Sequence, residues 1–227
     1  MTNRQSALAL ASSLSFLTGL DESATQAILA AAESRRIAAK QNITTGGDKA
    51  AHLFLVRKGQ VHYYHLTKRG ESVLLAYLAP GDVIGLVTLL KSPSPYMATA
   101  EADSDCELLA WEHSVIRKLV SDYPLLGENG LHLALGYLRN YIDRHIGLVT
   151  KTAEERLAET LLKLGEQAGK VQADGIEIHA TNDQLGELAD ISPFTASRVL
   201  NNWVGSGILS KGRGRIVLHS PEALLIS

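Results

Sequence analysis

The sequence predicts an α+β protein built from an N-terminal antiparallel β-roll, one long helix and a C-terminal winged helix-turn-helix. Short β-prone segments separated by glycine turns fill residues 35–111. Apolar residues then recur with a seven-residue period behind Pro124, and two capped helices followed by two β-prone pieces complete the pattern. We place the boundaries of the three parts at residues 1–122, 123–150 and 151–227.

The composition restricts the classes of function. The 227 residues carry a formal net charge of −2, so a generally polybasic protein is excluded and any nucleic-acid binding must come from a local patch, doubled in a dimer. The single cysteine, Cys106, excludes within one chain a disulfide framework, a four-cysteine zinc site and a four-cysteine iron–sulfur cluster. We expect a reducing, cytoplasmic compartment and no membrane contact.

An apolar run of small residues occupies Ala7–Leu20 and has some features of a weak signal peptide. We prefer a short amphipathic helix, because three serines interrupt the run. The sequence contains no stretch of 18 apolar residues, so a membrane span is not expected. Asp21 is then expected to cap a helix over about Glu22–Ser34.

The β-roll is predicted from evenly spaced strands and turns. The β-prone segments are His52–Arg57, Gly59–Leu66, Glu71–Leu78 and Cys106–Trp111, and the turns fall at Gly46–Gly47, Lys58–Gly59, Arg69–Gly70 and Pro80–Gly81. Such spacing is typical of an antiparallel roll or barrel, which leaves a cupin-like enzyme as an alternative. His62 and His65 argue against that enzyme, because residues three apart on a strand point to opposite faces and cannot chelate one metal. We assign no catalytic residue and no metal site.

A short helix is expected at Glu112–Val120, and Pro124 begins a much longer one. Along the longer helix, residues recur at intervals of four and three: Leu131, Leu135, Leu138, Ile142, His145 and Val149. This heptad predicts that two copies of the helix pack together in a homodimer. A helix packed only on its own roll is the alternative, but a second apolar face serves that purpose, formed by Ala134, Tyr137, Tyr141 and Leu148.

Two capped helices follow a hinge at Lys151–Thr152, a linking helix at Ala153–Glu166 and strands within Val171–His179. The first begins at Thr181, a predicted N-cap with Gln184 three residues on. The second begins at Ser192, which precedes a proline at the first helical position. Their spacing is typical of a helix-turn-helix, although an ordinary αα-hairpin has the same outline.

The second helix has one apolar face and one polar face. The apolar face is Ala196, Val199, Leu200 and Trp203, and the polar face is Thr195, Ser197, Arg198, Asn201 and Asn202. Two β-prone pieces, Ile208–Ser210 and Arg215–His219, then flank a glycine-rich turn. No acidic residue lies between Ile191 and Pro221, whereas residues 151–227 as a whole hold eight Lys plus Arg against ten Asp plus Glu. The local basic surface predicts binding to the phosphate backbone of double-stranded DNA.

These motifs, in this order, resemble the family of transcription regulators typified by the cyclic-AMP receptor protein and the fumarate–nitrate reduction regulator. The segments that carry the resemblance are Lys58–Val61, Leu78–Gly85, Thr181–Gly186 and Thr195–Leu200. It implies a cyclic-nucleotide-binding-like roll, a dimer that reads an inverted repeat containing TTG, and RNA polymerase as a candidate partner. The expected DNA contacts are Thr181, Pro193, Phe194, Thr195, Ser197, Arg198, Asn201, Lys211, Arg213 and Arg215.

The resemblance also bears on the effector. In the cyclic-AMP branch a Glu holds the ribose and an Arg-Ser pair holds the phosphate, but the matching residues here are Leu86 and Tyr96–Met97. A buried phosphate needs a cationic or bidentate partner, so we expect that cyclic AMP is not the effector. The iron–sulfur branch is excluded because its cluster takes four cysteines. We expect a more apolar effector pocket, formed by Gly85, Leu86, Val87, Tyr96, Met97 and Tyr137.

Haem is one candidate cofactor for such a pocket, since Phe194–Arg198 looks like the nitrogen-oxide-responsive branch of the family. The histidines in or beside the roll are His52, His62, His65 and His113. A histidine on a strand is more often solvated or hydrogen-bonded than an axial ligand. An effector-free protein-interaction module remains a further alternative, which the salt dependence of DNA binding distinguishes.

Overall fold

The structure, a computed structural model, describes residues 15–225 and contains two compact units, Met1–Asn140 and Tyr141–Ser227. The units divide within the long helix α4 (Pro124–Thr150), so this helix contributes residues to both. The expected helix over Ala7–Leu20 lies largely outside the described residues, within which Ser15–Leu17 forms the short 3-10 helix η1. The domain boundaries expected at residues 122 and 150 stay a prediction.

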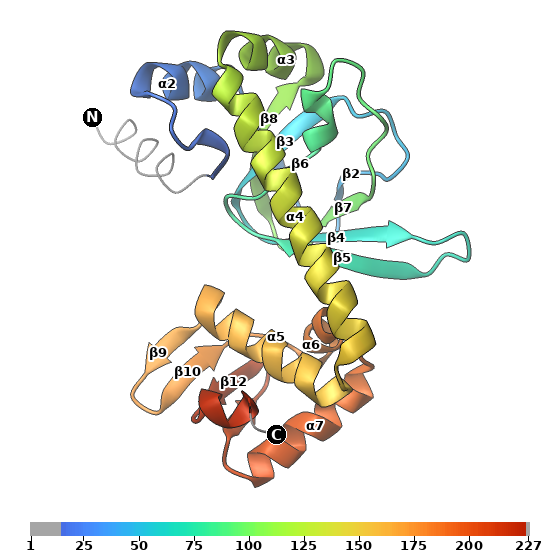
Figure 1. The fold of residues 1–227 in the computed structure, drawn as a ribbon, viewed down its shortest axis with the longest axis vertical. Helices are drawn as coiled ribbons and strands as arrows, with labels where there is room; N and C mark the ends of the chain where they lie inside the picture. Colours follow the sequence, from blue (N-terminus) through green and yellow to red (C-terminus); the bar gives the residue numbers. More distant parts are fainter. Residues whose placement is uncertain (1–14, 226–227) are drawn as a thin grey trace. The chain divides into compact units, whose positions relative to one another are not determined.

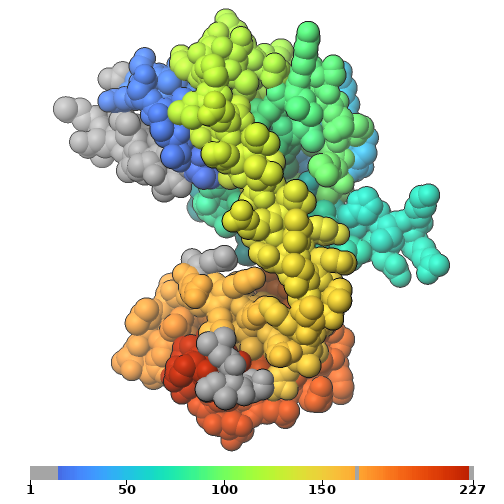
Figure 2. Space-filling view, viewed as in Figure 1, coloured from blue at the N-terminus to red at the C-terminus, as the bar shows by residue number. Residues whose placement is uncertain are grey.

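The N-terminal unit contains two four-stranded antiparallel sheets that form the β-roll (Figure 1). One sheet has the order β1-β8-β3-β6 and the other β2-β7-β4-β5. The strands are β1 (Glu33–Ile37), β2 (Asn42–Thr44), β3 (His52–Lys58), β4 (Val61–Leu66), β5 (Ser72–Leu78), β6 (Val83–Ile84), β7 (Thr99–Ala102) and β8 (Cys106–Glu112). The strands predicted in β3, β4, β5 and β8 are therefore confirmed. The tip of the β4–β5 hairpin extends beyond the rest of the roll (Figure 2).

The first described α-helix, α2 (Glu22–Ala30), is shorter than predicted. It begins as expected, because the Ala24 amide donates to the Asp21 carboxylate at 2.7 Å. The prediction that it continues to Ser34 is wrong. Residues 33–37 form β1 instead, with Ser34 opposite Leu109 of β8, and an antiparallel ladder of five residue pairs outweighs a weak helical preference.

The core of the roll joins the helices to the sheets. Trp111 on β8 is fully buried, and its indole Nε1 donates to the Ile28 carbonyl of α2 at 2.8 Å. The ring of Phe16 packs edge-on against Trp111, with 6.4 Å between ring centroids. A buried Asn129 on α4 donates to the carbonyl oxygens of Phe16 and Thr18. Each of these polar groups thus finds a partner, which removes the penalty of burying it.

Two helices follow the roll, α3 (His113–Asp122) and α4. The inward stripe of α4 in the N-terminal unit is Leu126, Leu133 and Tyr137. The prediction that Ala134, Tyr141 and Leu148 form a packing face is wrong, because Ala134 is exposed and the other two are 58% and 44% exposed. The buried stripe passes through Leu133, and the next residue on a helix points about 100° away from it.

The C-terminal unit places three helices around a four-stranded sheet of order β11-β12-β10-β9. The helices are α5 (Ala153–Ala168), α6 (Asn182–Ala189) and α7 (Pro193–Gly205), and the strands are β9 (Lys170–Gln172), β10 (Gly175–Ile178), β11 (Leu209–Gly212) and β12 (Arg215–Leu218). The 3-10 helix η3 (Pro221–Leu225) follows. The three α-helices, the strands near Val171–His179 and the two strands of the wing agree with the sequence prediction, whereas η3 was not predicted. Within residues 15–225, none of the helices combines the length and the apolar character that a bilayer-spanning segment requires.

We predict that Leu161→Ala lowers the free energy of unfolding of the C-terminal unit by about 2–5 kcal/mol, because Leu161 is fully buried and its removal leaves a cavity. Denaturant titration monitored by the fluorescence of Trp203, in a Trp111→Phe background, measures this change. The control is Lys163→Ala, an exposed position of the same helix, which is expected to change the value by less than about 0.5 kcal/mol. Equal effects of the two substitutions contradict the assignment of Leu161 to the core.

Candidate nucleic-acid interface

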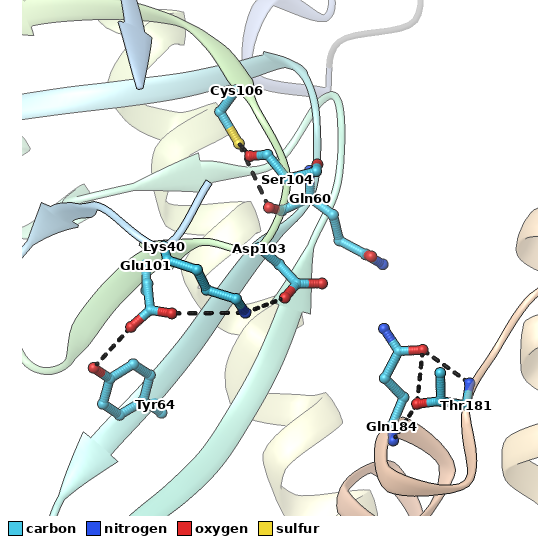
Figure 3. Close-up of polar contacts among 9 residues, drawn as sticks. All are labelled: Lys40, Gln60, Tyr64, Glu101, Asp103, Ser104, Cys106, Thr181 and Gln184. Carbon is cyan, nitrogen blue, oxygen red and sulfur yellow. Dashed lines mark hydrogen bonds and ion pairs between the residues drawn. The ribbon is translucent and has the colours of Figure 1, made fainter. Parts of the chain in front are cut away.

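Local capping fixes where α6 begins. The Gln184 amide donates to Thr181 Oγ1 at 3.2 Å, and the Thr181 amide donates to Gln184 Oε1 at 3.0 Å (Figure 3). This reciprocal capping box confirms the predicted N-cap. The helix ends at Asp190, whose φ of 53° lies in the left-handed region.

The start of α7 is fixed in the same way. The Thr195 amide donates to Ser192 Oγ at 3.0 Å, and Pro193 occupies the first turn, where its missing N–H has no consequence. The two helices approach closely at Gly186, where an added Cβ would lie 2.9 Å from the Ile191 carbonyl oxygen. A larger residue at Gly186 therefore forces the turn apart. The pair therefore forms the closely packed two-helix unit that the sequence predicted.

One face of α7 is buried and the other is exposed. Ala196, Val199, Leu200 and Trp203 are each at most 2% exposed, as predicted. On the other face Phe194 is 79% exposed, and Pro193, Arg198 and Asn201 are also exposed. Thr195 and Ser197 are half-buried at the edge. The structure thus brings the expected base-contacting residues onto one solvent-facing surface of a single helix.

The wing is the β11–β12 hairpin, whose turn carries the expected cations. Arg215 pairs with Glu177 of β10, with 2.8 Å between Nη2 and Oε2, and His179 Nε2 lies 2.9 Å from the other oxygen of the same carboxylate. In the part of the chain that the structure describes, Lys211 and Arg213 form no ion pair. The sequence analysis missed Glu177, because this residue lies outside the segment without acidic residues and reaches the wing only through the pairing of β10 with β12.

A hollow of about 320 Å³ lies between the wing and the start of α6. Residues 180–183 line one side of it and residues 211–214 line the other. The first turn of a helix presents unpaired backbone N–H groups and a partial positive charge. Thr181, Lys211 and Arg213 therefore gather around this hollow, which Asp183 also lines, and the two cations with the helix start favour an anion such as a DNA phosphate there.

The residues of the expected effector pocket range from buried to largely exposed. Tyr96 is buried, and its hydroxyl donates to the His52 carbonyl at 2.8 Å and accepts from the His52 amide at 3.0 Å. Burial raises the pKa of the Tyr96 phenol, which keeps the donated proton in place. Gly85 has a φ of 82°, and a Cβ there would lie 2.7 Å from the His52 oxygen and 3.0 Å from the Tyr96 ring. Gly85 and Tyr96 are thus in close contact.

The other four expected pocket residues are distributed around this contact. Leu86 packs against the core of the roll, Val87 is half-buried, and Met97 is 73% exposed. The Tyr137 hydroxyl donates to Asp82 Oδ1 and accepts from the Val83 amide, each at 3.1 Å, and burial raises its pKa. Their joint role as an effector pocket stays a prediction.

Three of the four roll histidines have contacts within the protein, and a role of any of the four as an axial haem ligand stays a prediction. Arg35 Nη2 lies 2.8 Å from His52 Nε2, and burial together with the nearby Arg35 charge lowers the pKa of His52. His113 Nε2 contacts the Leu90 carbonyl at 3.1 Å, and the His62 ring packs against the rings of Tyr64 and Tyr77. His65 is exposed. Within residues 15–225, no group of three or more His, Cys, Asp or Glu is placed to hold a metal ion.

Cys106 is a buried free thiol, as the sequence suggested for a core position. Its Sγ donates to the carbonyl oxygens of Ser104 and Gln60 (Figure 3). Burial raises the pKa of the thiol, so it remains protonated near neutral pH and unreactive as a thiolate.

Two protein-family models match the chain. The model of the cyclic nucleotide-binding domain matches residues 34–123, and that of the Crp-like helix-turn-helix domain matches residues 155–225. The first match covers the strands of the roll and α3, and the second covers α5, α6, α7 and the wing.

Individual relatives agree with these matches. The chain is 26% identical to the cAMP-activated global transcriptional regulator CRP of Escherichia coli O6:H1 over 182 residues, which are 79% of this chain and 86% of that protein. It is 25% identical to the fumarate and nitrate reduction regulatory protein of Vibrio cholerae, over 81% of this chain and 74% of that protein. The solved structure of FixK2 from Bradyrhizobium japonicum is similar with a TM-score of 0.74 and 25% identity, covering 86% of this chain and 96% of that one.

The named curated relatives are transcription regulators, which sets aside the cupin-like enzyme. The roll, the long helix and the winged helix-turn-helix occur in the order that the family shares. Because one family model matches the roll, the other matches α6, α7 and the wing, and the relatives span both, the chain belongs to the CRP/FNR family of DNA-binding transcription regulators.

Proposed function

We propose that the chain works as an effector-responsive homodimer that reads an inverted repeat of TTG-containing half-sites through α7. The observation that carries this proposal is the solvent-facing surface of α7, on which Arg198 and Phe194 project from a helix held by its buried face. A helix presented in this way fits the major groove.

Arg198 is the residue that we assign to the guanine of the half-site. Its planar guanidinium matches the O6 and N7 acceptors that guanine presents in the major groove. Ser197 is one position away and donates or accepts as its hydroxyl rotates. Phe194 offers no hydrogen bond, so its exposed ring serves for contact with a thymine methyl group.

The phosphate contacts are assigned to the hollow between the wing and α6. Lys211 and Arg213 supply charge there, and the capped first turn at Thr181 supplies backbone N–H groups. Arg215 contributes less charge to DNA than the sequence suggested, because Glu177 already neutralises it. Pro193, Thr195 and Asn201 flank the base-reading residues and complete the proposed surface.

The dimer is assigned to the heptad row of α4. Its members Leu131, Leu135, Leu138, Ile142 and Val149 are 59%, 52%, 52%, 47% and 74% exposed. Figure 2 shows the outer side of this helix uncovered. A row of large apolar side chains with this period fits a second copy of the same helix, which buries it. Two-fold symmetry then makes the binding site an inverted repeat.

The effector is proposed not to be cyclic AMP. The Escherichia coli relative is, by its name, activated by cyclic AMP. In this chain the Tyr96 hydroxyl is already bound to the backbone of His52, and Leu86 packs against the core of the roll. Neither side chain offers the charged partner that a buried phosphate requires. Contact with RNA polymerase stays an expectation from the resemblance.

We predict that cyclic AMP at millimolar concentration gives no binding heat in titration calorimetry and does not change the affinity for DNA. The reason is the absence of a charged partner at residues 86 and 96. The Escherichia coli relative, titrated under the same conditions, is the positive control. Micromolar binding that tightens DNA affinity contradicts the prediction.

We predict that Arg198→Ala costs about 1–3 kcal/mol per half-site and abolishes discrimination at the guanine. Arg213→Ala is the matched cationic control on the wing. It should weaken binding to all sequences alike and reduce the slope of log affinity against log salt by about 0.9 for each phosphate that the variant no longer neutralises. Binding titrations against duplexes with each base at the guanine position measure both effects. If Arg198→Ala keeps full discrimination, α7 does not read that base.

We predict that the double substitution Leu135→Asp and Leu138→Asp converts the protein to a monomer, because it places unpaired charges in the apolar seam. Analytical ultracentrifugation measures the change. The control carries the same two new carboxylates at Gly136 and Asn140, exposed positions of α4 outside the heptad row, and should remain dimeric. A dimer in the Leu135/Leu138 variant places the seam elsewhere.

A further inference from the structure

Asp190 lies in the turn between α6 and α7 and has an unusual backbone conformation. Its φ of 53° is in the left-handed region, which glycine adopts freely and which Asp and Asn tolerate better than other residues. Both oxygens of the Asp190 carboxylate accept hydrogen bonds from the Arg144 guanidinium. Arg144 Nε is 2.6 Å from Oδ2, and Arg144 Nη2 is 2.5 Å from Oδ1. The turn is therefore held by a bidentate ion pair as well as by its own backbone.

Arginines also satisfy the free carbonyl groups at the end of α6. Arg144 Nη2 donates to the Glu187 carbonyl at 3.1 Å, and Arg156 donates to the carbonyls of Ala189 at 2.9 Å and Asp190 at 3.2 Å. The last carbonyls of a helix have no partner within it and carry a partial negative charge. Two guanidinium groups at this position donate hydrogen bonds to these carbonyls, and their positive charge interacts favourably with the partial negative charge of the helix end.

The two arginines come from the elements that lead into the DNA-binding helices. Arg144 belongs to α4, two residues after Ile142 of the proposed dimer seam, and Arg156 belongs to the first turn of α5. Only Lys151 and Thr152 lie between these helices, and Arg156 Nη1 also donates to the Lys151 carbonyl at 2.8 Å. One network of hydrogen bonds thus joins the end of α4, the start of α5 and the turn before α7.

The Arg144–Asp190 ion pair is partly buried, so solvent and salt screen it less than an ion pair on the surface. The side chains of Arg144 and Asp190 are 23% and 26% exposed, whereas Lys151 and Glu159, which also form an ion pair in this unit, are 35% and 41% exposed. Bidentate arginine–carboxylate pairs fix direction as well as distance, and partial burial reduces screening by salt. The geometry suits a joint that holds two helices at a set angle.

We propose that Arg144, Asp190 and Arg156 form a positioning clamp that fixes α7 relative to residues 141–150 of α4, which carry Ile142 and Val149 of the proposed dimer seam. In a dimer the seam sets the two-fold axis, so the clamp sets how far apart and at what relative rotation the two α7 helices are presented. The clamp therefore makes binding depend on the spacing between half-sites. This inference rests on the proposed function.

The test compares DNA duplexes that differ only in the spacing of two TTG half-sites. Inserting one base pair moves one half-site by about 3.4 Å and rotates it by about 35°. We expect the wild type to lose at least about tenfold in affinity on insertion or deletion of one base pair, within the usual range of coupling between sites. For Arg144→Gln and Asp190→Asn, the loss should fall to less than about threefold.

Two controls separate positioning from general stability. Binding to a duplex with a single half-site should stay within about twofold of wild type in both variants, since the reading surface of α7 is unchanged. Glu159→Gln removes the Lys151 ion pair and should leave the spacing preference intact. Asp190→Gly removes the carboxylate but suits the left-handed conformation, so it replaces Asp190→Asn if that variant melts early.

The outcomes separate the two proposals. If Arg144→Gln and Asp190→Asn keep the wild-type spacing preference, or lose single-half-site binding to the same extent as repeat binding, the clamp is refuted while the proposed function stands. If the wild type itself shows no preference for a TTG inverted repeat, the proposed function fails and the clamp fails with it. A double variant that behaves like either single variant supports action of the pair as one unit.

Discussion

The proposed DNA-reading surface depends on the burial of one face of α7. Leu200 and Trp203 lie in the same core as Leu161 of α5 and Leu218 of β12, and burying a large apolar side chain contributes about 1.5–3 kcal/mol. These contacts fix the rotation of α7 about its own axis, so they also determine that Phe194 and Arg198 face solvent. The side chains of the buried face thereby determine which side chains are available for the proposed contacts with DNA.

Local features of the sequence were the most predictable. Asp21, Thr181 and Ser192 each accept a hydrogen bond from the amide three residues later, a relation that depends only on neighbours along the chain. The apolar residues of α7 recur at intervals of three and four, and this spacing, which also depends only on near neighbours, predicted the buried face of the helix. By contrast, β1 reads Glu-Ser-Arg-Arg-Ile, with little β-forming character of its own, and becomes a strand because β8 offers a partner distant in sequence.

The candidate site shows the same limit. The sequence predicted that residues 86 and 96 lack a charged group for a nucleotide, but not that the Tyr96 hydroxyl bonds to both backbone groups of His52. It predicted the polar face of α7, but not the contacts of Arg144 and Arg156 with the turn before it. Both features join residues that lie more than thirty positions apart, and periodicity contains no information about such pairs. Charge counting along the chain also missed Glu177 beside the wing.

The ion pair between Glu177 and Arg215 has a consequence for the search for binding sites in a genome. Nonspecific affinity for DNA grows with the number of phosphates that a protein neutralises. A wing that presents mainly Lys211 and Arg213 holds bulk DNA less tightly than its three cations suggest. A regulator must sample on the order of a million or more nonspecific sites, and a weaker hold on bulk DNA lets it leave each of them sooner. With the wing on the phosphates as proposed, Glu177 shortens these encounters without changing the preference between sites, because a backbone contact weakens all sequences alike.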